Sequence, residues 1–212
     1  MSTAKAWSPG TVPRDAVTLV TRVEDFRAAP YDDGGGVWTI GFGSTRDGDD
    51  RPVTPNTPPV TIDQAEVLLM RDMVSAAKSV QSQVQRVLLE HQAAALISWT
   101  YNLGAGNLAS STMLRKITQG EFSAVPSEMR RWHLQGKTPL LGLVRRRWAE
   151  AALWLGADPD RAAARAWTDI RQLTDWPDFA PSLPHTAKPP RLRSVPEGTR
   201  SSPDTTGGAE GL

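Results

Sequence analysis

The first regular pattern of apolar residues covers residues 13–26. Its members recur every three or four residues, the period of one helix face, and are Ala16, Leu19, Val20, Val23 and Phe26. Proline suits the first turn of a helix and disrupts later turns, so we expect a helix that begins at Pro13 and ends at Pro30. Glu24 lies at the margin of the apolar face, where docking of the helix would partly desolvate its carboxyl group. The alternative interpretation is a solvated glutamate at a helix end.

An alternating pattern typical of strands follows over residues 31–45. The three glycines at 34–36 can adopt the positive φ values of a tight turn, and the stretch VWTIGFG alternates as a strand with one covered face. We therefore expect a β-hairpin with Asp33 at the turn and Thr39 on the returning strand. Taken singly, aspartate before glycine is a common turn former and threonine a common strand former.

Beyond residue 45 the pattern predicts a loop followed by helices. Residues 46–59 combine charges, prolines and turn formers, which is typical of a loop. Thr61 suits a helix N-cap, and helical spacing continues from it to about Val87. This long helix can join a small lobe to a larger one. Glycines separate the further helices that we expect, at residues 89–103, 107–119, 121–134, 140–156 and 158–170.

Both ends of the chain have the composition of segments outside a folded core. Residues 1–12 are polar and contain glycine and proline, so we expect a flexible N-terminal arm. From residue 174, proline, glycine, serine and threonine dominate, and few apolar groups remain to offset the entropy of ordering. We therefore expect one folded domain over residues 13–173 and a disordered tail over 174–212. A proline-rich segment that binds a partner is the alternative for the tail.

Composition and charge narrow the class of protein. A chain of 212 residues suffices for one domain with a real core, and its formal net charge of +1 gives no reason to expect nucleic acid as a partner. The chain has no cysteine and only three histidines, far apart in sequence, which argues against a metal site. No stretch reaches the roughly 20 apolar residues of a membrane span, and the N-terminus lacks the apolar core of a signal peptide. We expect a protein that is made in the cytoplasm and does not insert stably into a membrane.

Three residues of the helix and hairpin have the chemistry of glycosidic bond cleavage. The change of direction from helix to hairpin can bring Glu24 and Asp33 to opposite sides of a cleft. One carboxyl group can then give a proton to the leaving oxygen while the other supports water or the developing cation. The hydroxyl group of Thr39 can position that water.

The spacing of these three residues and three later segments carry a family resemblance. Eight residues separate Glu24 from Asp33, five separate Asp33 from Thr39, and Ile-Gly-Phe-Gly follows at once. This pattern resembles the phage-type lysozymes, endolysins of glycoside hydrolase family 24. The segments TIDQAEVLLMRDM, QAAALISWTYNLGAGNLASSTMLRKI and MRRWHLQGKTPLLGLVRRRWAEAALW are also similar to family segments, so the resemblance covers about residues 14–156.

The resemblance implies an α+β, lysozyme-like fold with a small β-hairpin lobe, a larger mainly helical lobe and a cleft between them. It implies a muramidase, which hydrolyses the β-1,4 bond between N-acetylmuramic acid and N-acetylglucosamine in bacterial peptidoglycan without metal or organic cofactor. In the family, the residue matching Glu24 donates the proton. Those matching Asp33 and Thr39 stabilise the cationic transition state and orient the attacking water.

The resemblance also suggests residues beyond these three. Positions that face the sugar in the family match Tyr101, Asn102 and Gly104, for which helix capping is the alternative role. One of the three consecutive arginines at 145–147 can reach Glu24 and tune its chemistry, unless they form a solvated basic face.

The expected partner is the glycan strand of peptidoglycan, which a monomer would reach after a holin-like pore releases it from the host cytoplasm. Two alternatives remain open. A lytic transglycosylase would form an anhydro-muramic end, although Asp33 and Thr39 argue against it because that reaction has less need to position water. A catalytically silent peptidoglycan-binding or virion structural module would use the same scaffold, although the presence of all three residues argues against it.

Overall fold

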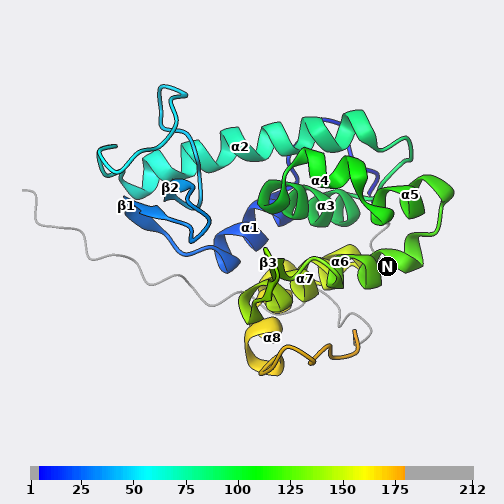
Figure 1. Ribbon diagram of the computed structural model, residues 1–212. Helices are drawn as coiled ribbons and strands as arrows, with labels where there is room; N and C mark the ends of the chain where they lie inside the picture. The colour runs from blue at the N-terminus through cyan, green and yellow to red at the C-terminus, as the bar shows by residue number, and fades with distance from the viewer. Residues whose placement is uncertain (1–4, 180–212) are drawn as a thin grey trace, which may run out of the picture.

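The chain forms a small lobe and a larger helical lobe that share one long helix. The computed structural model describes residues 5–179. The β1–β2 hairpin forms the small lobe, and α2 extends from it along the large lobe (Figure 1). The elements, in chain order, are α1 (Arg14–Val23), β1 (Arg27–Asp32), β2 (Trp38–Gly41), α2 (Ile62–Gln83), α3 (Glu90–Leu103), α4 (Ala105–Ser110), α5 (Thr112–Gln119), the 3₁₀ helix η1 (Phe122–Ala124), α6 (Val125–Arg130), β3 (Leu134–Gln135), β4 (Thr138–Pro139), α7 (Leu141–Trp154) and α8 (Pro159–Asp169). The expected α+β class, with a hairpin lobe and a helical lobe, is confirmed.

Helix α1 ends earlier than the sequence predicts. Glu24 closes the helix with a hydrogen bond of 2.9 Å from its N–H to the last turn, and the following strand β1 already includes Pro30. Phe26, which its spacing assigns to the helix face, instead lies 5.7 Å from Phe42 between ring centroids. Because β1 is hydrogen-bonded to one neighbouring strand only, proline is tolerated in it and does not mark the end of the helix.

Two neighbouring aspartates hold the turn of the β1–β2 hairpin. Asp32 Oδ1 accepts two N–H groups from the glycine run 34–36, at 2.8 and 3.0 Å. Asp33 Oδ1 accepts the N–H groups of Gly35 and Val37, at 2.7 and 3.2 Å. Two of the glycines have φ values of 85° and 81°, which side chains with a Cβ rarely adopt. The hairpin predicted from the sequence is confirmed, with Asp33 at its turn.

Helix α2 begins with a capping box and supports the hairpin. Thr61 Oγ1 accepts the Gln64 N–H at 3.2 Å, and the Gln64 side chain accepts the Thr61 N–H at 2.8 Å. Gly41, at the end of β2, lies so close to α2 that a Cβ added there would come within 2.8 Å of the Ala65 Cβ. This glycine therefore permits the close contact between strand and helix. The predicted N-cap is confirmed, and the helix ends slightly earlier than expected.

The core of the large lobe lies around α3 and α7. Residues 93–100 of α3 are buried without interruption. On α7, Trp148 and Trp154 are almost fully buried, and the Trp154 indole N–H donates to the Phe122 carbonyl at 3.1 Å. Helices α3 and α7 pack against each other, α1 contacts both, and α8 packs against α7, so α7 has a firm base for the side chains that it directs towards the end of α1.

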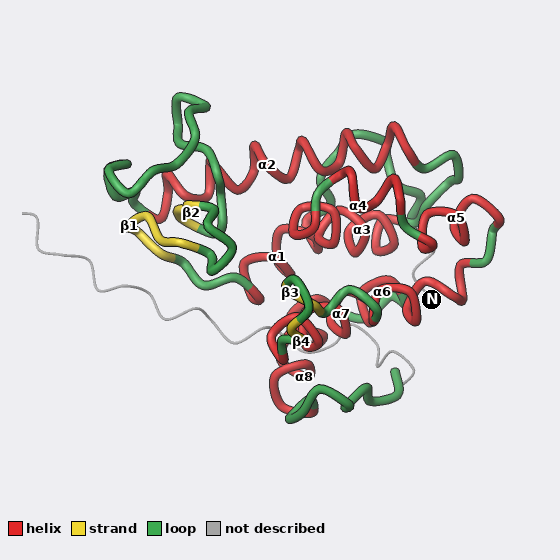
Figure 2. Tube along the Cα trace, viewed as in Figure 1, coloured by secondary structure: helices red, strands yellow, loops and turns green. Residues whose placement is uncertain are grey.

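Two helices predicted from the sequence are broken in the structure. The helix expected over residues 107–119 is divided into α4 and α5 by Ser111, whose Oγ accepts the Leu114 N–H at 3.0 Å and caps α5. The helix expected over residues 121–134 stops with α6. A second small hairpin, β3–β4, follows and turns at Gly136 with a φ of 59° (Figure 2). In both places a residue suited to a cap or turn ends the helix despite apolar spacing that continues past it.

The described part of the N-terminal segment packs against the domain. Trp7 is only 8% exposed, and its backbone N–H donates to the Leu88 carbonyl at 2.8 Å. The expectation of a flexible arm is therefore wrong for residues 5–12, because one large aromatic side chain gains enough from burial to fix a polar segment. Residues 1–4 lie outside the described part of the chain.

The first residues of the predicted tail also pack against the domain. Phe179 stacks on Trp148 with ring centroids 5.3 Å apart, and the Trp148 indole N–H donates to the Pro177 carbonyl at 2.8 Å. The expectation of a disordered tail is wrong for residues 174–179, since their aromatic side chains find partners on α6 and α7. The remainder of the predicted tail, residues 180–212, lies outside the described residues.

Candidate active site

Glu24 lies at the point where α1 gives way to the hairpin. Its side chain is 23% exposed, and its carboxylate forms an ion pair with Nη1 of Arg146 on α7. The group is thus partly buried beside a cation and reachable from solvent, which differs from a freely solvated glutamate at a helix end. A carboxyl group in this position can meet a substrate and is held in one orientation.

Arg146 connects Glu24 to a second, fully buried carboxylate. Its Nε lies 3.2 Å from Oε1 of Glu150, which also accepts a hydrogen bond of 2.9 Å from Ser98 Oγ. Burial of the guanidinium disfavours its charge, but Glu24 and Glu150 more than offset this effect, so the pKa of Arg146 is raised. Arg146 is therefore a permanent cation between two carboxylates.

Arg147 reaches another predicted site residue. Its Nη2 donates to Asn102 Oδ1 at 2.9 Å and to Glu150 Oε1 at 3.0 Å. Burial lowers the pKa of Arg147 to about 10, against the opposing attraction of Glu150. The interpretation of the arginines at 145–147 as a solvated basic face is wrong for these two, because α7 directs them into the protein. Arg145 lies elsewhere, and its Nε donates to the Ile170 carbonyl at 3.1 Å.

Asp33 occupies the exposed tip of the β1–β2 hairpin. Its Oδ1 is occupied by the turn N–H groups, and its backbone carbonyl accepts a hydrogen bond of 3.3 Å from Gln135 Nε2 on β3. The tip of the small lobe therefore meets the second hairpin, which belongs to the large lobe. The local sequence around Asp33 does not predict this contact, since Asp33 and Gln135 lie 102 positions apart in the chain.

Thr39 lies on β2 opposite Tyr31 of β1, and its side chain is buried within the small lobe. The residue is 5% exposed, and Oγ1 lies 3.5 Å from the Tyr31 carbonyl. That distance marks a weak hydrogen bond. The hydroxyl group is thus loosely held by the protein.

The three residues predicted to face sugar lie in two different environments. Tyr101 and Gly104 line one pocket of about 240 Å³, between the loop after β2, helix α2 and the end of α3. The Tyr101 hydroxyl group donates to the Phe42 carbonyl at 2.9 Å, and burial, followed by the nearby charge of Glu24, raises the pKa of Tyr101. Asn102 is not among the residues of this pocket and holds Arg147 instead. Gly104 is also the C-cap of α3, which is its alternative role, and its contact with sugar stays a prediction.

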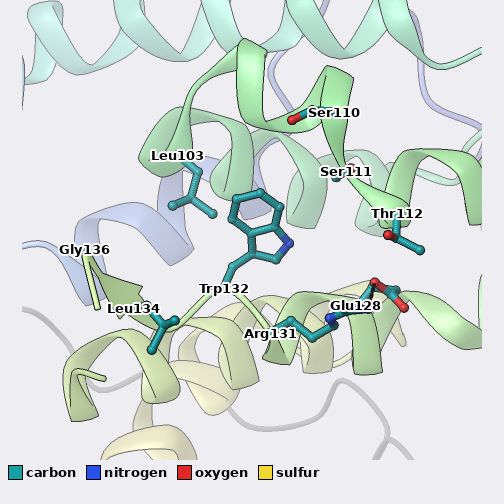
Figure 3. A pocket seen from close by; sticks show the side chains of 9 residues that line it. All are labelled: Leu103, Ser110, Ser111, Thr112, Glu128, Arg131, Trp132, Leu134 and Gly136. Atoms are coloured by element: carbon teal, nitrogen blue, oxygen red, sulfur yellow. Dashed lines mark hydrogen bonds and ion pairs between the residues drawn. The ribbon is translucent and has the colours of Figure 1, made fainter. Parts of the chain in front are cut away.

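A larger pocket, of about 420 Å³, lies in the large lobe between α4 and α6. The Trp132 indole projects into its centre, with Leu103 and Ser110 on one side and Leu134 and Glu128 on the other (Figure 3). The pocket combines an aromatic wall with hydroxyl and charged groups, which is the composition of sites for polar ligands. Sequence reasoning did not assign Trp132 to a site, and no spacing rule would have separated it from core tryptophans.

Two further properties concern residues 5–179. None of the helices described there is both long and apolar enough to span a bilayer. Within the same range, no group of three or more histidine or acidic side chains is arranged to hold a metal ion.

Comparison with known proteins identifies the family. The Phage lysozyme family model matches residues 21–150. The chain belongs to the phage lysozyme family. The endolysin of Acyrthosiphon pisum secondary endosymbiont phage 1 is 32% identical to it over 145 residues, which are 66% of this chain and 95% of the relative. The endolysin of Salmonella phage P22 is 32% identical over 141 residues, with the same two coverages of 66% and 95%.

Solved structures show the same relationship for the fold of this phage lysozyme. An endolysin from Escherichia coli O157:H7 phage FAHEc1 superposes with a TM-score of 0.62 at 26% identity, over 69% of this chain and 94% of that chain. A mutant of P22 lysozyme gives a TM-score of 0.59 at 29% identity, over 69% of this chain and 99% of that one. The lysozyme-like fold and the family that the sequence resembles are both confirmed.

Proposed function

We propose that this phage lysozyme is a muramidase, which hydrolyses the β-1,4 bond between N-acetylmuramic acid and N-acetylglucosamine. Members of its family hydrolyse peptidoglycan, and as an endolysin this protein does the same. The observation that supports the finer proposal is the position of Glu24, partly buried between the two lobes and oriented by Arg146. A glycosidase needs such a group to protonate the leaving oxygen.

In the proposed mechanism, Glu24 transfers its proton to the bridging oxygen as the bond to the anomeric carbon breaks. The anomeric carbon develops positive charge, which the carboxylate of Asp33 stabilises. Thr39 orients the water that attacks this carbon. Turn N–H groups already hold Asp33, and the loosely bonded hydroxyl group of Thr39 can exchange its weak contact for water. The roles of Asp33 and Thr39 rest on their spacing from Glu24 and on the family.

A substitution of the proposed acid tests this function. Glu24→Gln keeps the size of the side chain but cannot donate the proton, so clearing of permeabilised Gram-negative cells should fall by at least about a hundredfold. Turbidity measures the clearing, and circular dichroism should show an unchanged fold. A matched control is Glu90→Gln, which removes the same charge from an exposed ion pair with Lys5 and should clear cells as wild type does. Clearing by Glu24→Gln at the wild-type rate would remove the acid from the mechanism.

The route to the substrate is part of the proposal. The family acts on the cell wall, and we propose that the protein reaches it from the host cytoplasm through a holin-like pore, as a monomer that binds the glycan strand. Coexpression with and without a pore-forming protein checks this route. Lysis should require the pore, and lysis at the same rate without it would contradict the proposal.

A further inference from the structure

A buried network of charges on α7 connects two proposed site residues. Its members on the helix are Arg146, Arg147 and Glu150, whose side chains are 5%, 0% and 0% exposed. Glu150 Oε1 lies 3.2 Å from Arg146 Nε and 3.0 Å from Arg147 Nη2, and it accepts the Ser98 hydroxyl group at 2.9 Å. A carboxylate without exposure is stable only with such partners, because its desolvation costs several kcal/mol.

Each arginine also contacts a residue of the candidate site. Arg146 binds Glu150 through Nε and the carboxylate of Glu24 through Nη1. Arg147 Nη2 donates both to Glu150 and to the side-chain oxygen of Asn102, the latter at 2.9 Å. Glu150 is therefore the common partner of the two side chains that orient Glu24 and Asn102.

We propose that Glu150 is a positioning residue of the muramidase reaction, which fixes Arg146 against the acid and Arg147 against Asn102. The inference rests on the proposed function and deepens it. Glu150 itself is fully buried, so it cannot touch the substrate and acts through the two arginines.

The proposal has an electrostatic consequence for Glu24. Arg146 is shared between two carboxylates, so Glu150 competes with Glu24 for its positive charge. If Glu150 loses its charge, Arg146 is paired with Glu24 alone and the charge of Arg147 also acts on Glu24 from a distance. Both effects favour the ionised carboxylate over the protonated donor.

Other titratable groups near Glu24 or along its helix stay in place. From α3 it is faced by Tyr101, which is uncharged at neutral pH. Arg22, on α1, is engaged by Asp160 of α8 at 2.6 Å, and Asp25 is the next residue along the chain. None of these groups is changed in the variants below, so a shift in the pH profile reports on the α7 network.

The first test is Glu150→Gln, which keeps shape and hydrogen-bonding capacity but removes the charge. We expect kcat to fall about tenfold, because the donor is both less well oriented and less often protonated. The basic limb of the pH–activity profile should move to lower pH by on the order of one unit. Glu121→Gln removes the same charge from an exposed ion pair with Lys116 and should leave the profile in place.

A second variant separates the effect of the Glu150 charge on activity from any effect of its replacement on folding. Glu150→Gln combined with Arg147→Met removes one buried charge of each sign, so the loss of the carboxylate does not leave Arg147 as a buried charge without its partner. The basic limb should return towards its wild-type position, whereas KM should rise because Asn102 has lost its arginine. Release of reducing ends from purified peptidoglycan measures both constants, and circular dichroism monitors the fold.

The outcomes are distinct. If the wild type releases no muramic reducing ends, the proposed muramidase function is wrong. That result is distinct from a failure of the role proposed for Glu150, which is measured by comparing the variants with an active wild type. If the wild type is active and folded Glu150→Gln keeps its kcat and pH profile, Glu150 is not a positioning residue. A loss of activity with an unmoved basic limb, or a limb that does not return in the double variant, would reduce Glu150 to a structural role.

Discussion

At the residue scale, the proposed chemistry depends on one carboxylate that is partly buried, oriented and open to substrate. Arg146 provides the orientation of Glu24, and Glu150 prevents that arginine from acting on Glu24 alone. Tyr101 adds a third constraint from α3, since its hydroxyl group donates to the backbone of the small lobe beside the site.

Tyr101→Phe tests the contact between α3 and the hairpin lobe. The substitution leaves the nearly buried carbonyl of Phe42 without this donor, which should lower the free energy of unfolding by about 1–2 kcal/mol. Urea denaturation measures the change. A matched control is Thr118→Val, which removes an exposed hydroxyl group within α5 and should change stability by less than about 0.5 kcal/mol. Equal stability of Tyr101→Phe and the wild type would show that the hydrogen bond contributes nothing.

The sequence predicts the local part of the site and not its long-range contacts. Glu24, Asp33 and Thr39 lie on one continuous segment, so their spacing alone places them at a helix end, a turn and a strand. The sequence leaves open which arginine of 145–147 contacts Glu24. Successive residues on a helix point about 100° apart. Only the docking of α7 decides that Arg146 meets the acid. The available signal for Glu150 was its spacing, four residues after Arg146 and three after Arg147, which places it beside both on the helix.

At the scale of elements, aromatic side chains after α8 extend the packed part of the described chain to Phe179. Trp148 on α7 receives Phe179 on its face and donates its indole N–H to Pro177. The Arg130 guanidinium lies 5.2 Å from the centre of the Trp176 ring and donates to the Thr174 carbonyl at 3.2 Å. Residues 174–179 therefore pack against α6 and α7. Helix α7 also carries Arg146 and Glu150.

Two truncations test this boundary. Removal of residues 180–212 should leave the free energy of unfolding unchanged, since proline, glycine, serine and threonine dominate that sequence and few apolar groups are available for burial. Removal of residues 174–212 should lower it by on the order of 2 kcal/mol, because aromatic surface on Trp148 becomes exposed. Urea denaturation of both chains gives the comparison. The interpretation is wrong if the two truncations are equally stable.

Elements with strong local sequence signals lie where the sequence predicts them. Elements whose ends depend on tertiary packing do not. The capping box at Thr61 and the glycine run at 34–36 lie where the local rules place them. The end of α1, the break at Ser111 and the β3–β4 hairpin depend on partners elsewhere in the chain. The polar composition of residues 1–12 likewise gave no sign that Trp7 is buried. Composition describes the average of a segment, whereas one aromatic side chain is enough to hold this segment against the domain.

At the scale of the whole molecule, the residues of the proposed site come from both lobes. The lobes are joined by α2 and by side-chain contacts between the β1–β2 hairpin and the large lobe, such as Gln135 with the Asp33 carbonyl. In the proposed site, Asp33 and Thr39 belong to the small lobe, and Arg146 and Glu150 belong to the large lobe. We therefore expect a glycan strand to contact both lobes during cleavage.

We propose that the protein adds water to the muramic side of the glycan bond. Mass spectrometry of the fragments released from purified peptidoglycan distinguishes this reaction from its alternative. We expect fragments that end in N-acetylmuramic acid with a free reducing end, and we expect them to be absent from digests with Glu24→Gln. Fragments that are lighter by one water, with anhydro-muramic ends, would instead show a transglycosylase and overturn the proposal.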